Sequence, residues 1–228
     1  MGFEDYYKAF PTYTDVVSKD YQKRIQELKP HLIRVMKNTG KVLDLACGVG
    51  GFSFLLEDYG FEVIGLDISD IMIKKALSYA REKHSRVKFL IGDAKELPFD
   101  NNVFDYVLFL GNSTAHFLPN ELNRVFKEVK RVLKKDGLFL VNFIDMRALI
   151  PRIRTGTVVG EKYWINRIII DEDEKTALVE YKSEDDRFEV KFVIWGNTSI
   201  NLLAKFYFRP VSEVKLDEFS YLKVYQKK

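Results

Sequence analysis

Apolar and polar residues alternate along this chain in two distinct patterns. Short apolar runs with the length of buried strands occur at 42–45, 61–66, 87–91, 104–110 and 138–143. The segments between them favour helices, since Ser69 is a natural N-cap for a helix at 70–83. Pro119 opens another helix that reaches residue 133, and the Asp136-Gly137 pair is expected to close it. Strands that alternate with helices predict right-handed crossovers and a parallel sheet.

The second pattern lies at 157–195, where the apolar period changes to two. Ala177, Val179 and Tyr181 fall on one face of a predicted strand, and a run at 188–194 repeats the alternation. Each run therefore has one apolar face, which is typical of antiparallel strands. We expect a small antiparallel sheet that is inserted after the fifth strand of the main sheet.

The end of the chain completes the main sheet. After a helix near 197–205, the stretches 211–216 and 221–226 have the composition of strands and can return as the sixth and seventh, one of them antiparallel. The predicted fold is α/β, with a doubly wound, mostly parallel seven-stranded sheet of the Rossmann-like type and an inserted small antiparallel sheet.

These patterns divide the chain into three regions. Residues 1–40 are helical by pattern, and we expect an N-terminal helical cap there. The apolar residues that recur near helical spacing in this cap are Val17, Tyr21, Ile25, Leu28 and Leu32. Residues 41–156 and 196–228 form the main domain, and 157–195 form an inserted β lid. The insertion comes after the fifth strand and so emerges at the carboxyl-end side of the sheet, where ligands of such folds bind. The alternative for the insertion is an oligomerisation surface, as in a homodimer.

Composition and charge narrow the function. With 228 residues, 46% of them hydrophobic, the chain can bury one full α/β core. Its 36 basic and 33 acidic residues leave a net charge of +3, which gives no reason to expect a nucleic-acid surface. The single cysteine excludes an intrachain disulfide framework, no group of residues has metal-ligand spacing, and neither a signal-peptide pattern nor a membrane-length apolar run is present. We expect a cytoplasmic protein without a metal or a membrane partner.

The most informative stretch of the chain is 41–53. A buried strand that contains Asp44 runs into Gly48 and Gly50, which release the backbone into the turn that opens the next helix. A ligand is therefore expected at the carboxyl end of this strand. A dinucleotide site would require a third glycine where this chain has Ser53, and Asp44 would repel a phosphate but attract an ammonium. The loop suits a nucleoside that carries positive charge, such as S-adenosylmethionine.

Two further strand ends extend this picture. The second strand ends at Asp67, about twenty residues beyond the first, where a carboxylate can accept both hydroxyl hydrogens of a ribose. The third strand ends in Gly92-Asp93-Ala94. Asp93 can accept a hydrogen bond from the exocyclic amine of adenine, and the backbone N–H of Ala94 can donate to the ring.

In order and spacing, the segments 42–53, 65–69 and 92–99 resemble the class I S-adenosylmethionine-dependent methyltransferases. The resemblance covers 41–145 and implies a methyltransferase that uses S-adenosyl-L-methionine. The residues that it implies for cofactor binding are Asp44, Ala46, Cys47, Gly48, Gly50, Asp67, Ile68, Asp93, Ala94 and Leu110. Cys47 is expected as a small residue that fits the loop rather than as a nucleophile, because no histidine lies near it in the motif.

The segment 110–117, Leu-Gly-Asn-Ser-Thr-Ala-His-Phe, is similar to the glycine N-methyltransferase group, whose members methylate small amines. This resemblance implies a small-molecule acceptor with an amine nitrogen. In the methyltransferase class this segment passes the sulfonium, so Asn112 or Ser113 can orient an acceptor, and His116 is a candidate general base. An orienting or structural role is the alternative for His116. Other functions stay open. One is an RNA or protein methyltransferase, which would require a basic groove or an appended module. Another is a non-catalytic protein that binds S-adenosylmethionine, or a dehydrogenase with a degenerate dinucleotide fingerprint.

Aromatic residues near the start of the chain offer a further contact. Tyr6, Tyr7, Tyr13 and Tyr21 can close over the cofactor and face its sulfonium by cation–π contact. Core packing is the alternative for each of them, because an aromatic stripe at helical spacing is common in helix cores.

Overall fold

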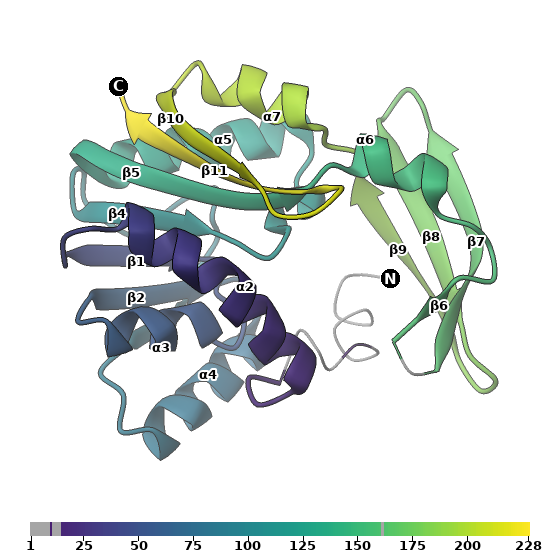
Figure 1. Cartoon of the computed structure of the whole chain (residues 1–228), viewed down its shortest axis with the longest axis horizontal. Helices are drawn as coiled ribbons and strands as arrows, with labels where there is room; N and C mark the ends of the chain where they lie inside the picture. Colours follow the sequence, from purple (N-terminus) through teal and green to yellow (C-terminus); the bar gives the residue numbers. More distant parts are fainter. Residues whose placement is uncertain (1–9, 11–14, 161) are drawn as a thin grey trace.

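Two sheets organise the protein in the computed structural model, which describes residues 10, 15–160 and 162–228 (Figure 1). The larger sheet has seven strands in the order β10-β11-β5-β4-β1-β2-β3. Its strands are β1 (Lys41–Leu45), β2 (Glu62–Asp67), β3 (Lys88–Ile91), β4 (Phe104–Phe109), β5 (Leu133–Ile144), β10 (Phe208–Lys215) and β11 (Ser220–Lys227). The strands β1 to β5 pair in parallel, whereas β11 is antiparallel to both β5 and β10. The predicted α/β fold with one antiparallel strand is confirmed.

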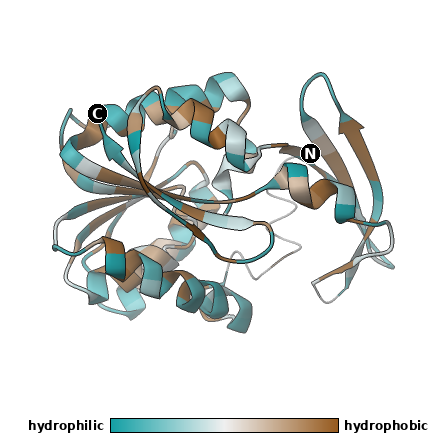
Figure 2. Ribbon diagram, turned by 45° about the horizontal axis from the view of Figure 1, so that its top comes forward, coloured by the Kyte–Doolittle hydropathy of each residue, from teal (hydrophilic) through white to brown (hydrophobic). Residues whose placement is uncertain are grey.

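Helices cover both faces of this sheet, because successive residues of a strand point to opposite sides. Val42 packs in a cluster with α2 (Lys19–Val35), α3 (Gly51–Asp58) and α4 (Asp70–Glu82). Leu43 packs on the other side with α5 (Pro119–Val132) and α7 (Asn197–Ala204). The central strands are hydrophobic along most of their length (Figure 2), as strands buried on both faces require.

The start of α2 corrects one part of the predicted helical stripe. Tyr21, Ile25, Leu28 and Leu32 are buried as expected. Val17 is not, since it lies before the helix and is 71% exposed. The cause is the N-cap Ser18, whose Oγ accepts a hydrogen bond from the Tyr21 amide at 3.3 Å and so begins the helix after Val17. Residues 1–9 and 11–14, which include Tyr6, Tyr7 and Tyr13, lie outside the described part of the chain.

The passage from α5 to β5 also differs from expectation. The strand begins at Leu133, so the Asp136-Gly137 pair lies inside it rather than in a turn before it. Asp136 has a φ of 63°, and the register between β4 and β5 shifts at this point. The pair therefore forms an irregularity within a longer strand, because a residue in the left-handed region can be absorbed there as a bulge.

The smaller sheet consists of β6 (Val158–Val159), β7 (Tyr163–Asp171), β8 (Thr176–Lys182) and β9 (Arg187–Val193), all antiparallel. Figure 1 shows it standing apart from the larger sheet, with α6 (Met146–Leu149) beside it. Its apolar face, which includes Val179 and Phe192, packs with Ala115, Met146 and Ile150. The antiparallel sheet predicted from the period of two is present. Among the described helices, none combines the length and the apolar character needed to cross a bilayer.

Candidate functional site

A cavity of about 450 Å³ lies at the carboxyl ends of β1, β2 and β4. Helix α2 borders it on another side through Tyr21 and Arg24. The predicted cofactor residues that line it are Asp44, Ala46, Cys47, Gly48, Asp67, Ile68 and Leu110. The parallel arrangement of the strands thus brings together seven of the residues that the sequence predicted for cofactor binding.

The glycine turn after β1 has two different requirements. Gly48 has a φ of 54° and open space around the position of a Cβ, so its conformation alone favours glycine. Gly50 has a φ of 86°, and a Cβ there would lie 2.5 Å from the Phe89 ring. Gly50 does not line the cavity. Its backbone packs against the Phe89 ring of β3, and the assignment of Gly50 to cofactor binding stays a prediction.

Asp44 is the buried acid of the site, with 2% of its surface exposed. Its Oδ2 accepts a 2.6 Å hydrogen bond from the Ser53 hydroxyl. Burial raises the pKa of Asp44 to about 7, and the nearby Asp67 carboxylate adds to this effect against the Ser53 hydrogen bond. A cation that enters the cavity would stabilise the ionised form of Asp44.

Asp67 holds the loops on both sides of the cavity. Its Oδ2 accepts from the Gly48 amide at 2.8 Å, and its Oδ1 accepts from the Ser69 amide at 2.9 Å. Burial raises its pKa, and these backbone hydrogen bonds oppose the rise. Each carboxylate oxygen has a second lone pair, so Asp67 can still accept hydrogen bonds from two ligand hydroxyls.

Asp93 and Ala94 do not line this cavity. The Asp93 Oδ1 accepts from the Lys95 amide at 2.8 Å, and its Oδ2 lies 3.5 Å from the Lys95 ammonium. Ala94 is buried in the cluster beneath α5. Lys95 itself lines the cavity instead. The assignment of adenine to Asp93 and Ala94 therefore stays a prediction.

Helix α2 contributes two residues to the cavity: Tyr21, which the sequence had indicated, and Arg24, which it had not. Tyr21 accepts a 3.2 Å hydrogen bond from the Gly51 amide, and burial raises its pKa to about 12, so its hydroxyl stays neutral. The Arg24 guanidinium lies 5.0 Å from the centre of the Tyr21 ring. Arg24 was missed because it lies more than sixteen positions before the first motif, on a helix with no ligand-binding signature. Its helical spacing of three from Tyr21 is the one signal that joins them.

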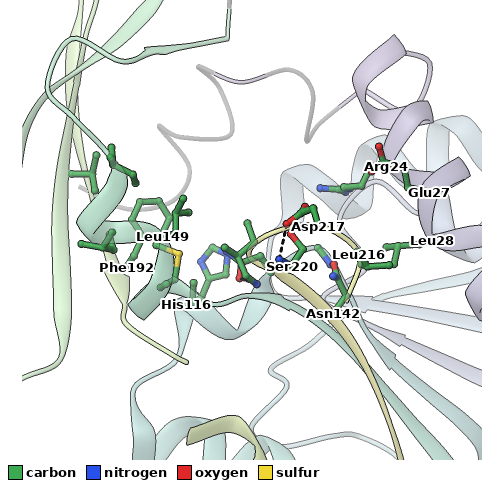
Figure 3. Close-up of a pocket in the computed structure, with 18 of the residues that line it drawn as sticks. Arg24, Glu27, Leu28, His116, Asn142, Leu149, Phe192, Leu216, Asp217 and Ser220 are labelled. Carbon is green, nitrogen blue, oxygen red and sulfur yellow. Dashed lines mark hydrogen bonds between the residues drawn. The ribbon is translucent and has the colours of Figure 1, made fainter. Parts of the chain in front are cut away.

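A second cavity of about 300 Å³ adjoins the first, and the two share Arg24, Gly111 and His116. Figure 3 shows this second cavity, with Arg24 and His116 labelled. It lies between α2, the end of β5, α6, the small sheet and the turn between β10 and β11. The small sheet contributes Val179 and Phe192 to its wall. The loop after β4 is therefore the boundary between two connected spaces.

The two catalytic candidates lie on this boundary loop. His116 ends the short 3₁₀ helix η2 (Ser113–His116), and burial lowers its pKa to about 4, so its imidazole is neutral. Asn112 lines the second cavity, and its Oδ1 accepts a 2.9 Å hydrogen bond from the Ile144 amide. Its side chain thus holds the loop to the end of β5 while it borders the ligand space.

Polar groups behind the loop fix its path. Asn142 of β5 accepts a hydrogen bond from the Gly111 amide at 3.3 Å and donates one to the Tyr221 carbonyl at 3.1 Å. The Ser113 hydroxyl donates to the Leu110 carbonyl at 2.9 Å. Within the part of the chain that the structure describes, no group of three or more His, Cys, Asp or Glu residues could hold a metal ion. The hydrogen bonds of Asn142 and Ser113 hold the loop between the two cavities.

Comparison with known proteins adds a family. A family model described as a methyltransferase domain matches residues 42–137. The chain is similar over 100% of its length, and of the other's, to the crystal structure of the PH0226 protein from Pyrococcus horikoshii OT3, with 56% identity and a TM-score of 0.93. It is 34% identical to glycine N-methyltransferase of Rattus norvegicus over 139 residues, and this match covers 54% of the chain and 47% of the rat protein. It is 34% identical over 138 residues to demethylmenaquinone methyltransferase of Bacillus licheniformis, covering 59% and 57%. The chain spans about half the length of these two relatives.

Proposed function

Because this chain belongs to the S-adenosylmethionine-dependent methyltransferases, we propose that it transfers the methyl group of that cofactor to a small-molecule acceptor. The observation that carries the proposal is the junction of the two cavities at Gly111 and His116. The larger cavity is lined by the strand-end carboxylates and the glycine turn. The second cavity is lined in part by residues of the small sheet, which contributes nothing to the first among the described residues. A donor and an acceptor placed in them would meet at the boundary loop.

We place the cofactor in the larger cavity. Its methionine end lies at 44–50, where Asp44 can pair with the α-ammonium directly or through water. Its ribose lies at Asp67, and its adenine lies toward Asp93 and Ala94. The burial of Asp44 supports this placement, because an ionised acid that is 2% exposed requires a positive partner.

The chain's own residues would contribute alignment and exclusion of water. When bound, the cofactor supplies an electrophilic methyl group on a sulfonium sulfur. The backbone at Leu110 and Gly111 would border that sulfur, and Asn112 would hold the loop at the acceptor. In the transfer, the acceptor's lone pair forms the new bond to carbon while the carbon–sulfur pair stays on sulfur, and the acceptor's proton passes to His116 or to water. The His116 imidazole is neutral and has a lone pair for that proton, but burial, which lowers its pKa to about 4, disfavours the charged ring, so the proton would pass on to water rather than stay there.

Two features support a small acceptor with an amine nitrogen. The second cavity holds about 300 Å³, which is the size of a site for a small organic molecule rather than for a polymer. The segment 110–117 is similar to the glycine N-methyltransferase group, and the rat enzyme of that name is among the relatives of this chain. An RNA or protein acceptor and a non-catalytic binding role are the outcomes against which the proposal is tested.

The test has two stages. Calorimetry with S-adenosylmethionine, S-adenosylhomocysteine and NADH should show binding of the first two alone. Incubation with methyl-labelled cofactor and a cell extract separated into small-molecule, RNA and protein fractions should then place the label among small molecules. Binding of NADH without the methionine compounds would refute the cofactor placement, and label in RNA or protein would refute the acceptor class.

A further inference from the structure

The end of the second cavity nearest to the small sheet is lined by apolar side chains. Leu149 and Ile150 reach it from α6 and the 3₁₀ turn η3 (Ile150–Arg152), Val179 from β8 and Phe192 from β9. Figure 3 shows Leu149 and Phe192 together on the side of the small sheet, with His116 next to them. This end is built by elements that are distant in sequence, so its apolar character is a property of the assembled fold.

The charged groups of the cavity lie at its other end, together with Ser220. Arg24 and Glu27 come from α2, Asp217 and Ser220 from the turn between β10 and β11, and Figure 3 shows all four on the far side of His116 from Phe192. Two backbone amides, of Phe219 and Ser220, donate to the Asp217 Oδ1 at 2.7 Å each. The cavity therefore has two different ends: a polar end at these four residues, which we call the rim, and an apolar end at the small sheet.

We infer that the methyl acceptor carries an apolar ring or branched chain next to its nucleophilic atom, and that this apolar part fills the end of the cavity between α6 and the small sheet. The inference rests on the proposed function and narrows its acceptor. A zwitterionic amino acid does not fit this end, because a buried ammonium or carboxylate without partners is strongly disfavoured. The apolar wall instead rewards an apolar group, since burial of such surface drives binding.

The amide and imidazole side chains that line the cavity do not alter this requirement. The Asn112 Oδ1 is engaged by the Ile144 amide, and Asn142 is engaged by the Gly111 amide and the Tyr221 carbonyl. His116 offers a neutral ring. An acceptor atom at His116 is thus matched by an uncharged nitrogen or oxygen, and the rim serves a polar group elsewhere on the same molecule.

The experiment uses protein loaded with S-adenosylhomocysteine and two sets of probes in ligand-observed NMR. Aniline, indoline and 2-naphthol are neutral rings with a nucleophilic atom, whereas glycine and sarcosine are zwitterions. At least one ring compound should bind, and neither zwitterion should. The variant Leu149→Gln keeps a helix-forming residue of similar size, and it should weaken ring binding about tenfold. Its matched control is Ala148→Gln, an exposed neighbour on the same helix that does not line the cavity.

The outcomes separate this inference from the proposed function. Binding of glycine or sarcosine, or no ring binding in protein that retains S-adenosylhomocysteine, would overturn the inference and leave the function standing. An equal loss in Leu149→Gln and Ala148→Gln would overturn the location. Loss of S-adenosylhomocysteine binding would instead strike the proposed function. If Leu149→Gln does not fold by circular dichroism, Ile153→Gln tests the same wall from a half-buried position with Arg154→Gln as its control.

Discussion

The Ser53 hydroxyl donates a 2.6 Å hydrogen bond to the Asp44 carboxylate, and both side chains are buried at the end of β1. Ser53 takes the position at which a dinucleotide-binding loop would have its third glycine. One hydrogen bond does not offset the burial of the acid, so the pKa of Asp44 remains raised, to about 7. The unliganded site therefore carries an acid that lowers the stability of the fold once it is ionised.

The variant Asp44→Asn should make the unliganded protein more stable at pH 8. The pKa of Asp44 rises from 3.8 in the unfolded chain to about 7 in the folded protein. The protonated acid therefore contributes fully to the stability of the folded state below pH 4, and this contribution is lost as the pH rises through 7. An asparagine can still accept the Ser53 hydrogen bond and has no charge to bury. We expect a gain of about 1–3 kcal/mol in the free energy of unfolding at pH 8 and almost none at pH 4, measured with urea. Equal gains at both pH values would contradict the burial argument.

Asp67→Ala should weaken the binding of S-adenosylhomocysteine by about 1–3 kcal/mol, because ribose hydroxyls would lose a buried acceptor. The fold should survive, since Asp67 lies at a strand end and its partners are the loop amides of Gly48 and Ser69. Calorimetry measures the loss, and Asp70→Ala is the control because its carboxylate is paired with Lys74 on the surface of α4. An unchanged dissociation constant would mean that Asp67 only holds the loops.

His116→Gln should reduce the acid sensitivity of the fold. Burial lowers the pKa of His116 from 6.5 to about 4, so its contribution to stability is present above pH 6.5 and is lost as the pH falls through 4. A glutamine does not titrate, and the variant should lose less stability than the wild type over this interval. Melting temperatures followed by circular dichroism from pH 7 to 4 measure the difference. His84→Asn is the control, since His84 is exposed and its φ of 51° suits asparagine. Parallel curves for wild type and His116→Gln would speak against a buried neutral imidazole.

The cofactor side of the site could be predicted because its signals are local. Asp44, Gly48 and Asp67 each follow or end a strand, and parallel strands bring their carboxyl ends to one edge. The local sequence pattern did not show why some positions have the residues they do, because the cause is a contact with a distant strand. Gly50 is required by the Phe89 ring of β3, and Asp136-Gly137 forms an irregularity inside β5 because long-range pairing continues the strand past it.

The lining of the second cavity could not be predicted from the sequence to the same extent. Arg24, Asn142, Phe192 and Asp217 come from four elements and meet only after the small sheet and the β10–β11 turn have packed. None of them has a fixed spacing from a motif. The helical stripe in α2 was predictable except for Val17, since the capping hydrogen bond of Ser18 decides where the helix begins.

Glu213→Ala should destabilise the fold more than Lys223→Met does. The Lys223 ammonium is almost fully buried on β11, where it pairs with the Glu213 carboxylate and donates to the Asn201 Oδ1 at 2.9 Å. Removal of Glu213 leaves a buried charge whose remaining contacts, Asn201 and the Phe143 and Tyr221 rings, are all neutral, at a cost of about 3 kcal/mol. Removal of the charge itself leaves an apolar side chain of similar length. Urea unfolding of both variants at pH 7 measures the order, and a larger loss for Lys223→Met would contradict it.

Replacement of 157–192 by a short Gly/Ser linker should abolish methyl transfer and leave cofactor binding intact. The small sheet lines the second cavity through Val179, Tyr181 and Phe192 and contributes no residue to the first. Residues 193–195 should stay, because Trp195 packs in the main core and its indole N–H donates to the Phe117 carbonyl at 3.0 Å.

Three measurements decide the outcome: calorimetry with S-adenosylhomocysteine, transfer of labelled methyl to the small-molecule fraction, and mass in solution. A Gly-Ser-Gly replacement of 172–174, in the exposed turn between β7 and β8, is the control and should retain both activities. Retained cofactor binding with lost transfer would support a lid over the acceptor. Retained transfer with a change in mass alone would instead assign the small sheet to contact between subunits, because an acceptor wall cannot be removed without loss of the acceptor.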